Sequence, residues 1–429
     1  MAVETSPIAV RTWLKRSLVV TLVIANVVVI AALYWVWQIR ETVDESIPTI
    51  PAEELTALVG DQKKDDEPLV ILLVGSDTRE GLTDDIEGEF GDFPGERADV
   101  IMMLRFDREN GVMQLVSLPR DLKVPKSDGT GFEKINATYA RGANAIVEAV
   151  GDISGIGIDH YIEIDFVSFV SIVDALGGVE LYFPLPARDL KSGLSVGVGN
   201  QKLNGAQALA FARSRSYQQL IDGQWSSLSG SDLERTSRQQ QLIFAILNQV
   251  SKPDNLLGMQ GLIAELGSDL TTDSALDFDL LVDLAWTFRE FSTENLEAIT
   301  LPVEFEGTRY LVAKEPEASA VFAAFASGQP LTPPNTAPPR ILVLNANGRE
   351  GAAAAAGDLL AANGFVAETD NSPESVADTL VVANPGWFAE AQDIVEVLGV
   401  GSAVDGVVPS GSDIVVYLGR DATIFGTDA

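Results

Sequence analysis

Cysteine is absent from this chain of 429 residues, and histidine occurs only once. The lack of cysteine excludes disulfides, thiolate metal sites and a cysteine nucleophile. The one histidine, His160, lies in the alternating segment IDHYIEIDF, far along the sequence from the arginine motifs described below. This position favours a structural role for His160 and leaves little room for a histidine general base.

Basic residues are also in short supply, with 29 Lys and Arg against 62 Asp and Glu and a formal net charge of −33. This charge disfavours general binding to the phosphate backbone of nucleic acid, so we expect no nucleic-acid partner. The sequence also lacks a glycine-rich loop that ends in the lysine of a P-loop, which disfavours a nucleoside triphosphatase. Any basic site in this chain must therefore be local.

One long apolar run is present at residues 18–37. As a helix it is long enough to cross a hydrocarbon core of about 30 Å. A cleavable signal peptide is the alternative, but the run is longer than the usual apolar region and no clear small-x-small cleavage site follows. Trp35 and Trp37 also resemble interfacial belt residues, so we expect a single-pass membrane anchor.

Charged residues on either side of the anchor predict its orientation. Arg11, Lys15 and Arg16 precede it, whereas acidic residues dominate after Arg40. The positive-inside rule then places the N-terminus in the cytoplasm and the bulk of the chain outside the cell membrane. Composition predicts a cytoplasmic N-terminus at 1–17, a transmembrane helix at 18–39, an acidic solvated stalk at 40–67, a main domain at 68–328, a proline-rich linker at 329–339 and a small domain at 340–421.

Strand and helix patterns alternate in both domains. In the main domain the apolar runs LVILLVG, DVIMMLRF and GVMQLVSLP predict strands, and Asn110-Gly111 between the last two predicts a hairpin turn. Helical patterns follow, and the clearest begins at Ser231 or Asp232. The expected fold class is α/β or α+β, with a central β-sheet flanked by helices and a small C-terminal α/β domain.

Arginine recurs beside carboxylates and glutamines in five short motifs. Guanidinium groups bind phosphate oxygens in bidentate fashion and keep their charge when desolvated, so converging arginines suit a buried polyanion. Salt bridges on an acidic surface are the alternative for any one arginine, but the set as a whole favours a pocket for a diphosphate and its metal. The motifs are GSDTR at 75–79, RAD at 97–99, SLPRD at 117–121, ARSR at 212–215 and DLERTSRQQ at 232–240.

Two aspartates are candidate metal ligands. Magnesium prefers a couple of carboxylates together with phosphate oxygens and water, and Asp77 and Asp99 each lie at the edge of a predicted strand. An arginine partner without a metal is the alternative for both.

The last motif places several polar residues on one face of its predicted helix. Asp232, Arg235 and Gln239 are spaced i, i+3 and i+7, and Arg238 lies next to them. The polar first half of this helix is therefore expected to line a site while the apolar second half packs.

The ordered segments ILLVGSDTR, RADVIM, LVSLPRDLKV, KINATYARG, DALGGVEL, LNGAQALAFARSR and DLERTSRQQ resemble the LytR-CpsA-Psr (LCP) family of membrane-anchored cell-wall ligases over residues 69–328. Residues 340–419, with LVLNANGREG before an alanine-rich helix, resemble the LytR C-terminal domain that often follows, mainly in actinobacteria.

The resemblance implies an enzyme outside the membrane. It would transfer a glycopolymer, such as teichoic acid, arabinogalactan or capsule, from a polyprenyl diphosphate carrier to a peptidoglycan hydroxyl. It also implies an apolar tunnel for the lipid between residues 100 and 247, and Mg²⁺ as cofactor, with Mn²⁺ as an alternative. Carried over motif by motif, the metal ligands would be Asp77 and Asp99; the diphosphate-binding residues Arg97, Arg120, Arg213, Arg215, Arg238 and Gln239; and the catalytic residues Arg97, Arg120, Asp121, Asp232 and Arg235.

The sequence leaves the identity of the general base open. Asp121 and Asp232 are candidates by type, but a carboxylate beside arginines has a lowered pKa and is a poor base, which leaves orientation as the other role. A diphosphatase that uses water, and a wall-binding or regulatory protein without activity, are the rival functions.

The C-terminal domain has no comparable cluster of ionisable residues. Asn345, Asn347 and Arg349 are candidates for glycan binding, but an Asn-Gly turn that caps the following helix is the favoured interpretation.

Overall fold

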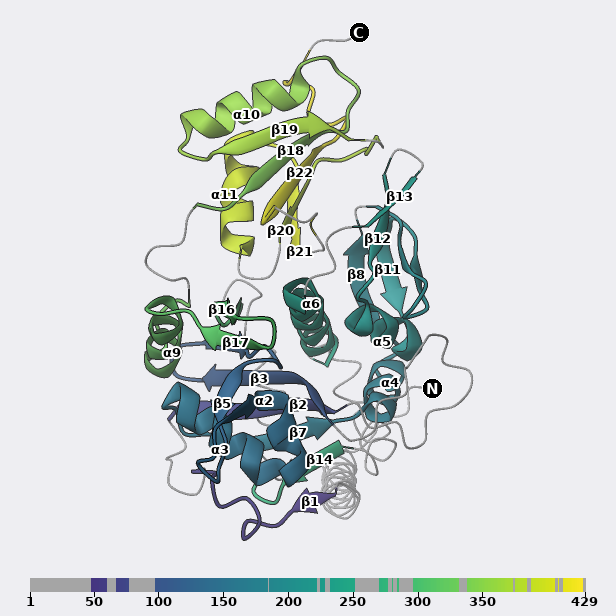
Figure 1. Ribbon diagram of the computed structural model, residues 1–429. Coiled ribbons are helices and arrows are strands. Elements are labelled where there is room, and N and C mark those ends of the chain that lie inside the picture. The colour runs from purple at the N-terminus through teal and green to yellow at the C-terminus, as the bar shows by residue number, and fades with distance from the viewer. Residues whose placement is uncertain are drawn as a thin grey trace, which may run out of the picture.

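The computed structural model gives the fold of most of the chain beyond its N-terminal part (Figure 1). The predicted membrane anchor at 18–39 and the predicted metal ligand Asp77 lie outside the described residues. Among the residues that are described, no helix is long and apolar enough to cross a membrane. The described residues are 48–59, 67–76, 97–183, 185–221, 224–227, 232–250, 270–276, 280, 284, 296–331, 338–372, 375–383, 387–405, 408 and 412–426.

A seven-stranded mixed sheet forms the centre of the main domain. The predicted turn at Asn110-Gly111 is confirmed, because it joins the antiparallel strands β3 (Ala98–Asp107) and β4 (Val112–Ser117) and Gly111 has a φ of 63°. In sheet order the strands are β1 (Thr49–Ile50), β14 (Leu270–Asp273), β7 (His160–Ile164), β2 (Leu69–Ser76), β3 (Ala98–Asp107), β4 (Val112–Ser117) and β15 (Leu296–Thr300).

Helices and short strand pairs surround this sheet (Figure 1). The helical elements of the main domain are α2 (Ile135–Thr138), the 3-10 turn η2 (Tyr139–Arg141), α3 (Ala143–Ser154), α4 (Phe166–Ala175), α5 (Gly205–Arg213), α6 (Asp232–Val250) and α9 (Glu317–Ser327). The short strands are β5 (Lys123–Pro125), β6 (Phe132–Lys134), β8 (Val179–Phe183), β9 (Ala187–Asp189), β10 (Leu194–Val196), β11 (Gly199–Leu203), β12 (Gln218–Ile221), β13 (Gln224–Ser227), β16 (Val303–Glu306) and β17 (Tyr310–Ala313).

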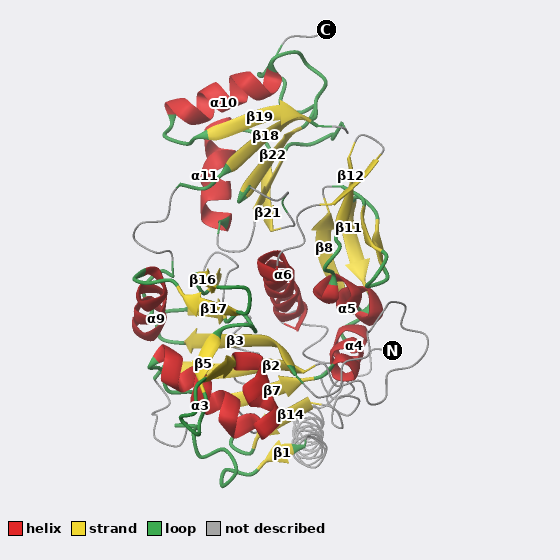
Figure 2. Cartoon of the chain, in the orientation of Figure 1, coloured by secondary structure: helices red, strands yellow, loops and turns green. Residues whose placement is uncertain are grey.

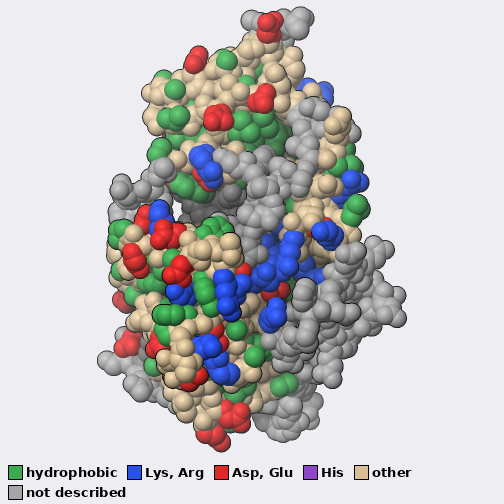
Figure 3. Space-filling view, in the orientation of Figure 1, with side chains coloured by type: hydrophobic (Ala, Val, Ile, Leu, Met, Phe, Trp, Pro, Cys, Tyr) green, Lys and Arg blue, Asp and Glu red, His purple; other side chains and the backbone are tan. Residues whose placement is uncertain are grey.

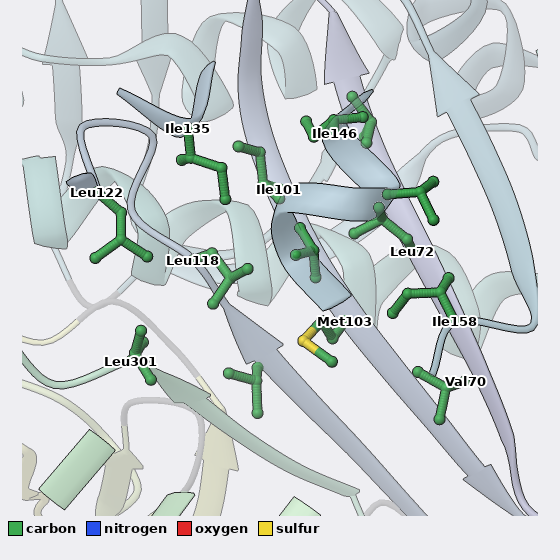
Figure 4. Packing of buried hydrophobic residues seen from close by; sticks show 14 of the residues in the cluster. Val70, Leu72, Ile101, Met103, Leu118, Leu122, Ile135, Ile146, Ile158 and Leu301 are labelled. Carbon is green, nitrogen blue, oxygen red and sulfur yellow. The ribbon is translucent and has the colours of Figure 1, made fainter. Parts of the chain in front are cut away.

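Both faces of the central sheet are buried, which explains why β2 and β3 are apolar almost throughout. On one face, Leu72 and Met103 pack in a core with α3 and α9, and Figure 4 shows part of this packing. On the other face, Ile71 and Met102 pack with Phe244 of α6. Successive residues of a strand point to opposite faces, so each strand contributes to both cores.

A second layer, built from α4, α5 and the short strands β8 to β13, carries the ARSR motif. Helix α5 begins with a capping box in which Asn204 and Gln207 satisfy each other's backbone amides. It packs closely on α4, because a Cβ atom added to Gly205 would lie 2.3 Å from the carbonyl oxygen of Val170. This packing fixes the start of α5, the helix that ends at Arg213 of the motif.

The C-terminal domain is an α/β unit, as predicted (Figure 2). One face of its sheet packs against both of its helices, and Tyr182 of β8 packs against Tyr417 and its neighbours on the other face. The two domains are therefore in contact through β8. The sheet order is β19 (Ala367–Asn371), β18 (Ile341–Asn345), β22 (Ile414–Leu418), β20 (Leu380–Ala383) and β21 (Ser402–Asp405), and the helices are α10 (Ala352–Ala362) and α11 (Phe388–Leu398).

The prediction of a solvated stalk over residues 40–67 is wrong for residues 48–59. Strand β1 pairs in parallel with β14, and the backbone amide of Val59 donates to the carbonyl oxygen of Ile158 across 2.8 Å. Leu55 is only 2% exposed and belongs to the main core, where Ile50 and Leu58 pack beside it. These apolar side chains attach the segment to the domain in spite of its acidic neighbours.

Candidate active site

A cavity of about 540 Å³, called the main cavity here, opens between the ends of β2 and β3 and the helices α4, α5 and α6. One part of its wall is apolar and the other is charged. The apolar wall consists of Leu73, Val100, Ile164, Phe166, Phe169, Leu209, Leu242 and Ile243, and the charged part includes Arg97, Asp99, Arg120, Arg213, Arg215 and Arg235. Figure 3 shows Lys and Arg side chains gathering in the middle of the visible face, over the region of α5 and α6.

The Asp99 carboxylate is the anionic centre of the charged part. Its Oδ1 accepts a hydrogen bond from Arg120 Nη1 across 2.6 Å, and its Oδ2 lies 3.9 Å from Arg215 Nη2. Burial alone would raise the pKa of Asp99, but Arg120, Arg235 and Arg215 together bring it below the ordinary value. Asp99 is therefore ionised at neutral pH and is a poor proton acceptor.

A buried carboxylate, Asp189, holds the ARSR motif in place. Its Oδ2 accepts hydrogen bonds from the Ser214 hydroxyl at 2.6 Å and from the backbone amides of Arg215 at 2.9 Å and Ser216 at 2.7 Å. Burial raises the pKa of Asp189, but these hydrogen bonds outweigh it and lower the pKa overall. Sequence reasoning missed this residue, because an aspartate before a Leu-Lys-Ser turn gives no local sign of a partner about 25 positions away.

Helix α6 contributes two of its predicted residues to the main cavity. Arg235 and Gln239 line the cavity. Arg238 does not: it is 3% exposed, its Nη2 donates to the Ser214 carbonyl oxygen at 2.5 Å, and its guanidinium lies 5.1 Å from the centre of the Tyr217 ring. The prediction that Arg238 binds the diphosphate is therefore corrected to a role in supporting the ARSR loop. The side chain of Asp232 lies outside the described part of the structure.

Asp121, predicted as catalytic, lies in a neighbouring cavity of about 380 Å³, called the second cavity here. Its Oδ1 is 2.9 Å from Lys134 Nζ. Arg97 and Arg120 line both cavities, so they stand at the boundary between them. The structure thus brings together Arg97, Asp99, Arg120, Arg213, Arg215, Arg235 and Gln239, with Asp121 across this boundary.

Within the described ranges no cluster of three or more acidic or histidine side chains is placed to hold a metal. The residues at hand nevertheless fit magnesium, since this ion usually takes one or two carboxylates and fills its other positions with substrate phosphates and water. Asp99 supplies an ionised carboxylate at the rim of the cavity. Asp77, the second predicted ligand, lies outside the described residues.

His160 lies away from both cavities and is 6% exposed. Its Nδ1 is 3.2 Å from Asp273 Oδ2, which joins β7 to the neighbouring strand β14. This buried position beside Asp273 agrees with the predicted structural role of His160.

The three polar candidates of the C-terminal domain are engaged with one another. Asn345 Nδ2 donates to the Arg349 carbonyl oxygen at 2.8 Å, and the Arg349 amide donates to Asn347 Oδ1 at the same distance. The turn is therefore present, with Gly348 at a φ of 79°. The expected helix cap is wrong, because α10 begins after Gly351 without a side-chain cap.

Comparison with known proteins gives matches over both domains. Residues 33–326 match the LytR_cpsA_psr family, and residues 339–421 match the family described as LytR cell envelope-related transcriptional attenuator. The probable cell wall biosynthesis protein LcpB of Corynebacterium glutamicum is 38% identical over 43% of this chain and 43% of its own length. The cell wall biosynthesis protein LcpA of the same organism is 29% identical over 56% of this chain and 51% of its own length. The chain thus spans about half the length of these relatives.

TagU of Bacillus cereus, named a polyisoprenyl-teichoic acid-peptidoglycan teichoic acid transferase, is 28% identical over 62% of this chain and 78% of its own length. Among solved structures, the LytR-Csp2A-Psr enzyme from Actinomyces oris aligns with a TM-score of 0.48 and 26% identity, over 60% of this chain and 89% of that one. The family match alone covers well over half of the sequence. The protein belongs to the LytR-CpsA-Psr family and carries a LytR C-terminal domain.

Proposed function

We propose that this protein is a membrane-anchored enzyme that transfers a glycopolymer from a polyprenyl diphosphate carrier to a peptidoglycan hydroxyl. The N-terminus would lie in the cytoplasm and both domains outside the cell membrane. The name of TagU, which specifies a polyisoprenyl-linked teichoic acid and peptidoglycan, supports this class of reaction.

The observation that carries this proposal is the division of one cavity into an apolar wall and a ring of arginines. Phe169, Leu209 and Leu242 provide a surface on which a hydrocarbon chain is stable. Arg213 and Arg215 face the same space from the end of α5 and the turn after it. A polyprenyl diphosphate is amphipathic in the same manner, with its phosphates directly attached to an apolar chain.

In the proposed reaction the acceptor hydroxyl oxygen attacks the glycan-side phosphorus. A new P–O bond forms, the bond from that phosphorus to the bridging oxygen breaks, and polyprenyl monophosphate leaves. The hydroxyl proton passes to solvent or to the departing phosphate, since Asp99 has a lowered pKa and is a poor base. The arginines of the main cavity would stabilise the negative charge that develops on the phosphate oxygens.

Magnesium is part of this proposal. Asp99 would hold the ion together with substrate phosphates, and Asp77 is the second predicted ligand. When bound, the ion would neutralise phosphate charge that the arginines share.

The test uses the full-length chain in lipid nanodiscs with a polyprenyl diphosphate oligosaccharide and soluble peptidoglycan fragments, with and without magnesium. Mass spectrometry should detect polyprenyl monophosphate and a phosphodiester-linked adduct, both reduced by EDTA and by Arg213→Ala. Monophosphate without the adduct would instead identify a diphosphatase. Neither product, with folded protein and intact donor, would contradict the proposal.

A further inference from the structure

The second cavity is enclosed by elements that the main cavity does not use. It lies between the β5–β6 hairpin, α2 and the turn of the β16–β17 hairpin. The two hairpins are tied together, because Leu122 bridges Leu311 and the Leu311 amide donates to the Asp121 carbonyl oxygen at 3.1 Å. The cavity is therefore a built part of the fold and not a gap between loose loops.

Its lining is basic in a strongly acidic protein. Three basic residues line it together with Arg97 and Arg120 at the boundary, against two carboxylates. The basic residues are Lys126, Lys134 and Arg309, and the carboxylates are Asp121 and Glu133. The net charge of the chain is −33, so this local excess of cations indicates a ligand that carries negative groups.

An aromatic surface accompanies these cations. Phe132 is 52% exposed, and Lys123 Nζ lies 4.3 Å from the centre of its ring. Tyr310 is next to it, with its hydroxyl donating to the Phe132 carbonyl oxygen at 3.3 Å, and the Arg309 guanidinium lies 5.2 Å from the centre of the Tyr310 ring. Apolar ring faces beside fixed charges suit a ligand that combines sugar rings with anionic groups.

The second cavity adjoins the main cavity, and the proposed reaction needs a separate path by which the acceptor reaches the phosphorus. The attacking and leaving oxygens of a phosphoryl transfer lie roughly in line with the phosphorus between them. If the polyprenyl phosphate leaves into the main cavity, the acceptor hydroxyl must approach from the opposite side. Arg97 and Arg120 face both spaces, so a phosphorus held by them is accessible from the second cavity.

We propose that the second cavity is the acceptor subsite, which binds a peptidoglycan glycan strand with its carboxylate-bearing peptide. This inference rests on the proposed function and assigns its acceptor. Lys126 and Arg309 bind peptide carboxylates, Phe132 contacts a sugar face, and Asp121 lies on the side from which the hydroxyl enters. The glycan of the donor is the competing occupant.

The experiment measures acceptor binding and transfer separately in the full-length chain in nanodiscs. The probe is an uncrosslinked tetrasaccharide of peptidoglycan with its peptides. Arg309→Ala and Phe132→Ala each remove a side chain that lines the second cavity and not the main cavity. Phe305→Ala is the matched control, since Phe305 lies on the neighbouring strand β16, is 81% exposed and lines neither cavity. Leu209→Ala reports on the main cavity.

The dissociation constant of the probe and the KM for acceptor should rise about tenfold in Arg309→Ala and about threefold in Phe132→Ala, as expected for loss of a charged or an apolar contact. The ratio of transferred to hydrolysed donor should fall in both. Phe305→Ala should change none of these values by more than about twofold, and Leu209→Ala should raise the KM for donor instead. The side chains altered in Arg309→Ala and Phe132→Ala are exposed, and melting temperatures check that these two variants fold.

Unchanged probe binding in both variants, with a wild-type chain that transfers, would overturn the acceptor subsite and leave the proposed function standing. A raised KM for donor with unchanged probe binding would assign the second cavity to the donor glycan and also overturn the inference. A wild-type chain that neither transfers nor binds the probe would mean that the proposed function itself fails.

Discussion

Asp99 Oδ1 and Arg120 Nη1 lie 2.6 Å apart, so an ion pair joins the start of β3 to the turn after β4. Arg120 belongs to both cavities, and Asp99 belongs to the main cavity only. An incoming phosphate therefore meets an arginine whose charge is already partly balanced. The balance of attraction and repulsion at this pair should control both substrate affinity and turnover.

Replacement of Asp99 should separate these two effects. Asp99→Asn keeps the volume of the side chain and removes its charge. The arginines should still bind the diphosphate, so its affinity should be retained, whereas loss of the proposed magnesium ligand should lower kcat about 100-fold. Steady-state kinetics with the polyprenyl diphosphate donor would measure both. Asp358→Asn on the exposed side of α10 is the matched control. A rise in KM with unchanged kcat would show that Asp99 serves donor binding only.

Arg213 should require a guanidinium and not merely a positive charge. It lines the main cavity, and its guanidinium lies 5.4 Å from the centre of the Phe166 ring. We expect Arg213→Ala to lower kcat/KM about 100-fold, and Arg213→Lys to recover less than about tenfold of this loss, because an ammonium cannot form the same planar fork. Full recovery in the lysine variant would contradict bidentate phosphate binding.

Asp189→Asn should destabilise the protein in a pH-dependent manner. Asn offers one acceptor where the carboxylate offers two, so Ser214, Arg215 and Ser216 lose part of their hydrogen bonding, and the free energy of unfolding should fall by about 1 to 3 kcal/mol at pH 7.

The pKa of Asp189 is lowered in the folded protein, so its contribution to stability is present above its unfolded pKa of about 3.9 and is lost as the pH falls through the lower folded value. Urea unfolding at pH 7, 5 and 3 should therefore show a difference between wild type and variant that is similar at pH 7 and 5 and smaller at pH 3. A constant difference at all three values would mean that the charge of Asp189 is not what stabilises the loop.

Gly205→Ala should loosen the contact between α4 and α5. The new Cβ would lie 2.3 Å from the Val170 carbonyl oxygen, so the helices must separate and unfolding should become easier by about 1 to 3 kcal/mol. Activity should also fall, since α5 carries Arg213.

Gly151→Ala is the control, because a Cβ at that position in α3 meets nothing closer than 3.8 Å and should stabilise the helix by about 0.5 to 1 kcal/mol. Equal changes in both variants would show that helix propensity, and not the close contact, governs Gly205.

The sequence predicted the elements whose local pattern matches their final environment. Strands β2 and β3 are apolar on both faces because both faces are covered, and the spacing of Arg235 and Gln239 placed both correctly on the cavity side of α6. Arg238 could not be assigned from its spacing, because a residue at the border of a helix face can point into the cavity or toward the adjacent loop. Here the carbonyl of Ser214 and the ring of Tyr217 decide its direction.

Long-range contacts account for what could not be predicted. Asp189 acquires its role when the chain returns at Ser214, and Leu55 is buried in a core built from residues far along the chain. The division of the basic residues between two cavities likewise depends on hairpins that are far apart in sequence.

The pairing of β1 with β14 also limits how far the main domain can stand from a bilayer. If residues 18–39 cross the membrane as proposed, only residues 40–47 connect that segment to the edge of the sheet. Eight residues span at most about 28 Å when fully extended. The main domain would then stay within this distance of the lipid surface, where a carrier lipid embedded in the bilayer is also confined.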